Sequence, residues 1–132
     1  MSHYSKVKTS VKNKDLLKKA LNRLGWAFEE GNFTITQYGT SSKAELKFSD
    51  AVGMSLQEDG TWSLVGDPYH DRGSLHKYYA KEKEFARDLG SAYAVTEASE
   101  ALEEQNFYCV ENEKGVVGPD GKIRMVFQSN SY

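Results

Sequence analysis

Hydrophobic and polar positions recur with different periods along the chain, and these periods predict the order of its elements. Residues 4–11 alternate with a period of two, which is typical of a half-buried strand. Residues 14–24 place leucine and alanine three and four positions apart, which predicts an amphipathic helix. Asn13 is the expected N-cap, and Gly25 supplies the residue that ends the helix.

Short strands and one strong turn signal follow this helix. Glu58-Asp59-Gly60 lies between two alternating segments and predicts a hairpin. Within it, Met54 and Leu64 are expected in the core, while Ser55 and Ser63 are expected to face solvent. The predicted strands of this region are residues 33–38, 43–48, 52–57 and 61–65.

The second half of the chain is predicted to be a loop, a helical region and a final hairpin. Residues 66–73 break the alternation and indicate a surface loop. Residues 75–104 carry an apolar stripe at helical spacing. Gly90 either divides this stripe into two helices or is tolerated inside one at a cost of about 1 kcal/mol, and we expect two segments with a bend near Gly90. Residues 107–111 and 122–127 are expected to pair across a glycine-containing loop.

These elements predict the α+β class. We expect a single domain over residues 1–128, with a frayed tail over residues 129–132. Its sheet should be mainly antiparallel, with about five to seven strands and with the helices packed mainly on one face. The expected topology is a variant of the ferredoxin-like arrangement, extended by additional strands.

Composition agrees with a folded domain and limits its location. The chain has 132 residues, of which 39% are hydrophobic, and only two are prolines. We expect no signal or transit peptide and no membrane-spanning segment. The single cysteine, Cys109, cannot form an internal disulfide and indicates a reducing compartment. The predicted location is therefore the cytoplasm.

The net charge of −2 conceals an asymmetry. Residues 1–25 carry seven lysine or arginine residues against one aspartate, a net charge of +6, which leaves −8 for the rest. Such an asymmetry either steers an anionic partner to the basic segment or lets two parts of the fold attract each other.

Four stretches of the chain resemble one protein family: residues 1–26 (MSHYSKVKTSVKNKDLLKKALNRLGW), 52–67 (VGMSLQEDGTWSLVGD), 92–107 (AYAVTEASEALEEQNF) and 119–127 (PDGKIRMVF). The family is known as hypothetical chloroplast reading frame thirty-five, a domain of unknown function. The resemblance implies an α+β domain of cyanobacteria, of plastids, where it would lie in the stroma, or of viruses that infect cyanobacteria, where it would lie in the host cytoplasm. It implies no reaction. Where the family tends to have tryptophan and glycine, this chain has Pro68-Tyr69.

Candidate catalytic chemistry is sparse. The predicted loop and its surroundings gather six polar or aromatic side chains, but their spacing matches no zinc signature. They are Asp67, Tyr69, His70, Asp71, Arg72 and His76. Cys109 lies in a predicted strand, and the sequence places no basic residue beside it to activate its thiol. The glycines of residues 115–121 lack the pattern of a P-loop, and the common hydrolase motifs are missing. We therefore expect no catalytic residue, no cofactor and no metal.

Two classes of binding function remain. The first is a non-enzymatic adaptor or regulator that binds an unidentified protein, since tyrosine and tryptophan suit interfaces and an exposed strand edge can pair with a partner. The alternative is a nucleic-acid-binding module that uses the basic N-terminal strand and helix. An enzyme or metal site around Asp67–His76 is the third possibility. The candidate contact residues are Lys14, Lys18, Lys19, Arg23, Tyr69, His70 and Arg72.

Overall fold

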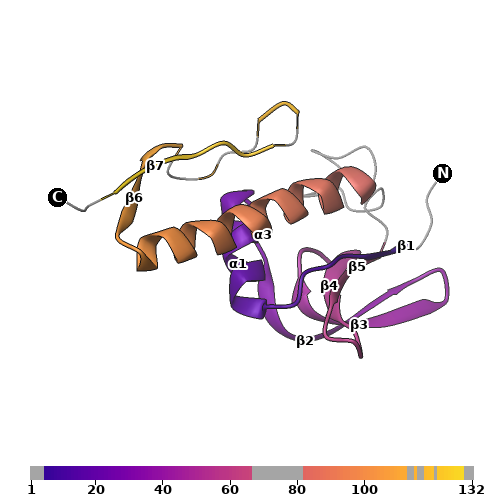
Figure 1. Cartoon of the computed structure of the whole chain (residues 1–132). Coiled ribbons are helices and arrows are strands. Elements are labelled where there is room, and N and C mark those ends of the chain that lie inside the picture. The colour runs from indigo at the N-terminus through magenta and orange to yellow at the C-terminus, as the bar shows by residue number, and fades with distance from the viewer. Residues whose placement is uncertain (1–4, 67–81, 113–114, 116–117, 121, 130–132) are drawn as a thin grey trace. The chain divides into compact units, whose positions relative to one another are not determined.

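The structure is a computed structural model that describes residues 5–66, 82–112, 115, 118–120 and 122–129 (Figure 1). The chain divides into two compact units, residues 1–12 with 26–86 and residues 13–25 with 87–132. The described elements are β1 (Ser5–Lys8), α1 (Lys14–Arg23), β2 (Glu29–Gln37), β3 (Thr40–Lys47), β4 (Val52–Leu56), β5 (Trp62–Gly66), α3 (Glu82–Glu104), β6 (Phe107–Glu111) and β7 (Val126–Ser129).

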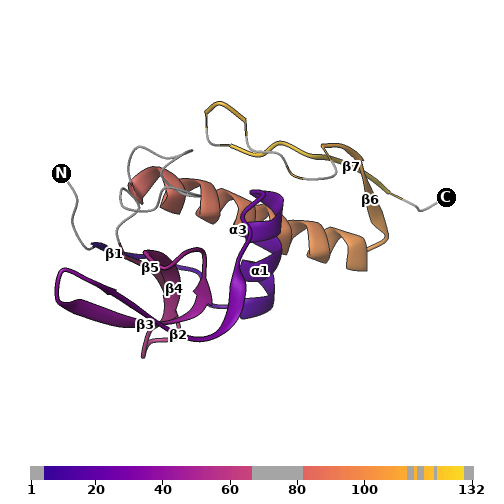
Figure 2. The ribbon, with the colours of Figure 1, turned by 180° about the vertical axis from the view of Figure 1, so that it is seen from behind.

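The first unit contains a five-stranded sheet in the order β1-β5-β4-β3-β2, in which every neighbouring pair is antiparallel. The predicted α+β class and mainly antiparallel sheet are confirmed. The strand order differs from the ferredoxin-like arrangement, which consists of split βαβ units. Here β2, β3, β4 and β5 follow one another through short connections, and strands joined by tight hairpins pair as antiparallel neighbours. β1 and β2 are therefore the two edges of the sheet (Figure 1 and Figure 2).

β5 is buried on both of its faces. The register of the β4–β5 hairpin pairs Met54 with Leu64, so the predicted hairpin is confirmed. Leu64 is 2% exposed, and Ser63, whose side chain points to the opposite face, is 0% exposed. The expectation that Ser55 and Ser63 face solvent is wrong, because the face that carries them is covered as well.

A hydrophobic cluster lies on this second face and buries Val65. Ile35 of β2 and Ala44 of β3 pack with Val65 of β5, although these strands are not direct neighbours of β5. Gly53 of β4 allows this approach, since a Cβ there would lie 2.9 Å from the Cβ of Ala44 and 2.7 Å from the carbonyl oxygen of Leu46. A larger residue at this position would push β3 away from β4.

Three aromatic rings form another part of the core of the first unit. Trp26, Phe48 and Phe85 meet edge to face, with centroid separations of 5.8 to 6.3 Å. This geometry sets the positive edge of one ring against the negative face of the next, which adds to the stabilisation from buried area.

Helix α1 begins and ends as the sequence predicts. The side-chain oxygen of Asn13 accepts a hydrogen bond of 3.1 Å from the N–H of Leu16, which satisfies one of the unpaired donors of the first turn. Gly25 follows the C-cap Leu24 with a φ of +77°, a left-handed conformation that glycine adopts without strain.

Helix α3 is continuous, so the predicted bend near Gly90 is wrong. Its residues from Glu82 to Glu104 form one helix through that glycine. Phe85, Leu89 and Ala92 lie on one stripe and are at most 1% exposed. Burial of this stripe stabilises the helix by more than the roughly 1 kcal/mol that glycine costs in a helix interior.

The second sheet contains only β6 and β7, which pair antiparallel within the second unit. Pairing of β7 begins at Val126 rather than at the expected residue 122, and it continues to Ser129, which pairs with Phe107. A register shift between Cys109 and Glu111 skips Val110, so that Cys109 pairs with Phe127 and Glu111 pairs with Val126. Ser129 thus belongs to a strand, while residues 130–132 lie outside the described residues.

The same substitution at two glycines should have opposite effects on stability. Gly90→Ala should raise the free energy of unfolding by about 0.5–1 kcal/mol, because an added Cβ meets no atom within 4 Å and alanine favours a helix. Gly53→Ala should lower it by roughly 1–3 kcal/mol through overpacking. Urea unfolding followed by circular dichroism measures both, and two changes of the same sign would contradict the packing described here.

Candidate functional site

The outer edge of β1 carries no strand among the residues that the structure describes. The N–H of Thr9 donates to the carbonyl oxygen of Trp62 at 3.1 Å, and the register continues through Val7 and Leu64. Backbone hydrogen bonds alternate in direction along an antiparallel strand. The N–H and C=O groups of Lys6 and Lys8 therefore point away from β5, toward the open side.

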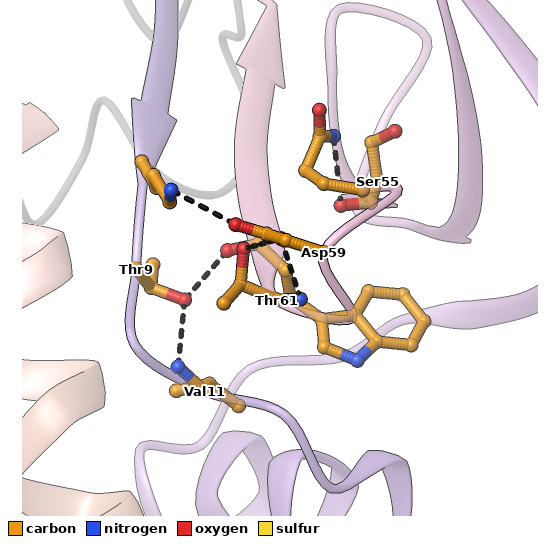
Figure 3. Close-up of polar contacts among 8 residues, drawn as sticks. Thr9, Val11, Ser55, Asp59 and Thr61 are labelled. Atoms are coloured by element: carbon orange, nitrogen blue, oxygen red, sulfur yellow. Dashed lines mark hydrogen bonds and ion pairs between the residues drawn. The ribbon is translucent and has the colours of Figure 1, made fainter.

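An aspartate in the β4–β5 turn holds the C-terminal end of β1. Asp59 accepts hydrogen bonds from the N–H of Thr61 at 3.0 Å and from its hydroxyl at 2.6 Å, and its other oxygen lies 2.9 Å from Nζ of Lys8 (Figure 3). The hydroxyl of Thr61, followed by Lys8, lowers the pKa of Asp59 well below its ordinary range. The carboxylate thus ties the turn to the edge strand.

Backbone contacts with β5 continue beyond the end of β1. The hydroxyl of Thr9 donates to the carbonyl oxygen of Trp62 at 2.6 Å and accepts from the N–H of Val11 at 3.2 Å (Figure 3). The N–H of Trp62 in turn donates to the carbonyl oxygen of Val11 at 2.9 Å. The edge is consequently an ordered surface and would pay little conformational entropy when a partner pairs with it.

An open pocket of about 620 Å³ lies beside this edge. Its charged groups are of both signs, and Asp59 neutralises Lys8 within it. Lys6 has no ion pair or side-chain hydrogen bond among the described residues. The lining residues are Lys6, Lys8, Gln57, Glu58, Asp59 and Ser63.

Ser63 contributes an unusual polar atom to the lining. Its side chain is 0% exposed, and its hydroxyl has no hydrogen-bond partner in the described part of the chain. Ser63 is the Cα partner of Lys8, and side chains of directly paired residues share a face of the sheet. A buried hydroxyl without a partner is costly and rare in folded proteins, and the indole N–H of Trp62 is likewise buried without a hydrogen-bond partner in the described part of the chain.

Two of the predicted basic contact residues of α1 are held by α3. Nζ of Lys19 forms an ion pair with the carboxylate of Glu100, and this hydrogen bond and charge raise the pKa of Lys19. Nε of Arg23 donates to the hydroxyl of Thr96 at 2.9 Å, and its Nη1 lies 3.9 Å from the sulfur of Met125. Both side chains therefore make contacts within the second unit.

The other predicted contact residues either take part in further interactions or lie outside the described residues. Lys14 and Lys18 lie on α1 and also take part in interactions. Tyr69, His70 and Arg72, together with the other members of the 67–76 cluster, lie outside the described residues. A contact role for these residues stays a prediction.

Other chemistry is limited in the described part of the chain. It contains no group of three side chains that would hold a metal, and none of its helices is long and apolar enough to cross a membrane. The thiol of Cys109 donates to the carbonyl oxygen of Glu111 at 3.0 Å. A smaller apolar groove of about 230 Å³ lies between α3 and residues 123–127.

No family model, curated protein or solved structure matches the chain.

The sequence contained part of the signal for this site. The alternation of residues 4–11 predicted a half-buried strand, and residues 58–60 predicted a hairpin turn. Neither pattern shows that β1 pairs with β5, because that pairing joins residues 53 positions apart. Ser63 was missed because its alternation with hydrophobic neighbours is typical of a solvated face.

Removal of the unpaired hydroxyl should stabilise the protein. Ser63→Ala is expected to raise the free energy of unfolding by about 1 kcal/mol, since it deletes a buried polar group that has no partner. Thr61→Val is the matched control, because the same kind of deletion there breaks the hydrogen bond to Asp59 and should destabilise. Chemical unfolding of both variants measures the difference, and a destabilised Ser63→Ala would contradict the assignment.

The contribution of Asp59 to stability should depend on pH. Its pKa is lowered in the folded state, so the carboxylate stabilises fully above the ordinary aspartate pKa of 3.8 and progressively less as the pH falls below it. The stability difference between wild type and Asp59→Asn should therefore be constant from neutral pH to about pH 5 and shrink in stronger acid.

Thermal unfolding across this pH range measures that difference. Glu58→Gln removes a carboxylate from the same turn and serves as the control. A difference between wild type and Asp59→Asn that persists unchanged at pH 2.5 would show that the charge of Asp59 plays no part.

Proposed function

We propose that this protein is a non-enzymatic binding protein that accepts an extended polypeptide segment as an added strand on the open edge of β1. The observation that carries the proposal is the outward direction of the N–H and C=O groups of Lys6 and Lys8 on an ordered edge strand. Strand addition uses such groups for affinity and neighbouring pockets for side-chain specificity. The pocket beside Lys6 and Lys8 provides the second requirement.

Charge favours a partner strand over a second copy of β1. In a two-fold antiparallel pairing centred on Val7, Lys6 would lie opposite Lys8 of the other copy. Like charges in directly opposed positions destabilise a sheet. A segment with acidic residues on the lysine face and apolar residues on the half-buried Val7 face is complementary instead.

Nucleic-acid binding through α1 is the weaker candidate. Two of its four basic side chains, Lys19 and Arg23, already contact α3. Release of these contacts would subtract from the free energy of binding a phosphate backbone.

Proline substitution at Lys6 tests strand addition directly. The probe is a random linear twelve-residue peptide library displayed on phage and selected on the immobilised full chain. Selected peptides should bind wild type and lose at least about tenfold in affinity for Lys6→Pro, because proline removes the outward N–H and obstructs the edge. The fold should survive, since this N–H is not part of the ladder to β5.

Lys6→Ala is the reference for Lys6→Pro, because both substitutions remove the side-chain charge and only proline removes the backbone N–H. Amide hydrogen exchange adds a direct readout, in which a bound peptide should protect the N–H groups of Lys6 and Lys8. Peptides that bind Lys6→Pro as tightly as wild type, or that protect only amides away from β1, would overturn the proposal.

A further inference from the structure

The geometry points to Met125 as a site of reversible oxidation by a peroxide, at which Arg23 and Ser99 would bind the oxygen of the sulfoxide. This site lies in the second unit, and the inference does not depend on strand addition at β1. It rests on the two hydrogen-bond donors directed at the sulfur of Met125 and on the access that the apolar groove gives to it.

The sulfur of Met125 receives donors from two helices. Nη1 of Arg23, on α1, lies 3.9 Å from the sulfur, and the hydroxyl of Ser99, on α3, donates to it at 3.6 Å. A thioether sulfur is only a weak acceptor, so both donors have a poor partner at this position. This matters most for Ser99, because that residue is 3% exposed and its hydroxyl has little contact with water.

Neighbouring contacts hold the two donors in position. Nε of Arg23 donates to the hydroxyl of Thr96 at 2.9 Å, and Thr96, which is 2% exposed, donates to the carbonyl oxygen of Ala92 at 2.7 Å. Gly115 leaves space for the guanidinium, since a Cβ there would overlap Nη1 of Arg23. The donors are therefore in place before the sulfur is oxidised, and little further conformational entropy is lost when they bind an oxygen.

An oxygen on the sulfur would turn two weak contacts into ordinary hydrogen bonds. Hydrogen bonds to oxygen are about 2.7–3.0 Å long, roughly 1 Å shorter than the two distances to the sulfur. An oxygen bonded to the sulfur on the side of the donors closes most of this gap. The sulfoxide oxygen is also a stronger acceptor than the sulfur, and the hydrogen bond that it accepts from Arg23 is charge-assisted.

The apolar groove gives a peroxide access to the sulfur. Met125 is half-buried and lines the groove together with side chains of α3 and of residues 123–127. The groove has a volume of about 230 Å³, whereas a water molecule occupies about 30 Å³ and hydrogen peroxide is only slightly larger. Met54, in contrast, is 0% exposed in the core of the first unit. The described residues thus include one accessible and one enclosed methionine.

The oxidation step requires only the peroxide as co-reactant. A lone pair of the sulfur attacks one oxygen of hydrogen peroxide, so that the S–O bond forms and the O–O bond breaks. The proton of the transferred hydroxyl passes to the departing hydroxide, which leaves as water. The sulfur loses two electrons and the peroxide gains them. Methionine sulfoxide reductases reverse the step, with thiols as the source of the electrons, and release the oxygen as water.

Peroxide treatment of the full chain tests access to the site. Mass spectrometry of digests should show that Met125 gains one oxygen at least about tenfold faster than Met54, because susceptibility follows exposure. A mixture of the two epimer-specific methionine sulfoxide reductases should then remove this oxygen. Equal rates at the two methionines, or an oxygen that the reductases leave in place, would overturn the inference.

Variants of the donors distinguish a bound oxygen from the ordinary oxidation of an accessible methionine. In wild type, oxidation should change the folding equilibrium constant by less than about threefold, because the new hydrogen bonds offset the burial of a polar oxygen. In Ser99→Ala and in Arg23→Leu, the same oxidation should lower this constant about tenfold. Urea unfolding compares the oxidised and the reduced form of each variant, so the effect of the substitution itself cancels.

Met125→Leu is the control, because it keeps an apolar side chain of similar volume and cannot be oxidised. Peroxide should leave its stability unchanged, which would assign the effects in the other variants to Met125. An oxidation penalty that is the same in wild type, Ser99→Ala and Arg23→Leu would overturn the inference, and so would an equal penalty in Met125→Leu. If Arg23→Leu does not fold, Ser99→Ala still decides the question.

Discussion

The burial of β5 on both faces is the constraint on which the first unit depends. Trp62 and Leu64 occupy one face, and Ser63 and Val65 occupy the other, so the strand is surrounded like a strand of a parallel sheet although its neighbours are antiparallel. Each large apolar side chain that is fully buried in this way stabilises the fold by roughly 1.5–3 kcal/mol. β1 is only four residues long, and it is held in place because it pairs with this anchored strand.

Local signals in the sequence predicted the parts of the fold that local interactions determine. The cap at Asn13 and the turn at Asp59-Gly60 each depend on residues two or three positions away, and both are present. The errors concern distant contacts. No local signal marks Gly53, and only the close approach of Ala44 explains why it is required. Gly90 was expected to bend a helix, but burial of the stripe around it outweighs its low propensity.

Two ion pairs account for part of the charge asymmetry of the sequence. Lys8 pairs with Asp59 in the first unit, and Lys19 pairs with Glu100 in the second, so basic residues of the N-terminal segment meet acidic residues from later in the chain. Both pairs are partly exposed, and such pairs contribute little stability. They matter more for position, because one fixes the edge strand and the other joins α1 to α3. The basic charge of residues 1–25 is visible in the sequence, whereas the partners of Lys8 and Lys19 could not be predicted from it.

Ser63 carries a cost to stability that no contact in the described part of the chain offsets. Its buried hydroxyl has lost its contacts with water and gained none from the described residues, which lowers the free energy of unfolding. A protein selected for stability alone would place alanine there, since neighbouring positions on the strand are already apolar.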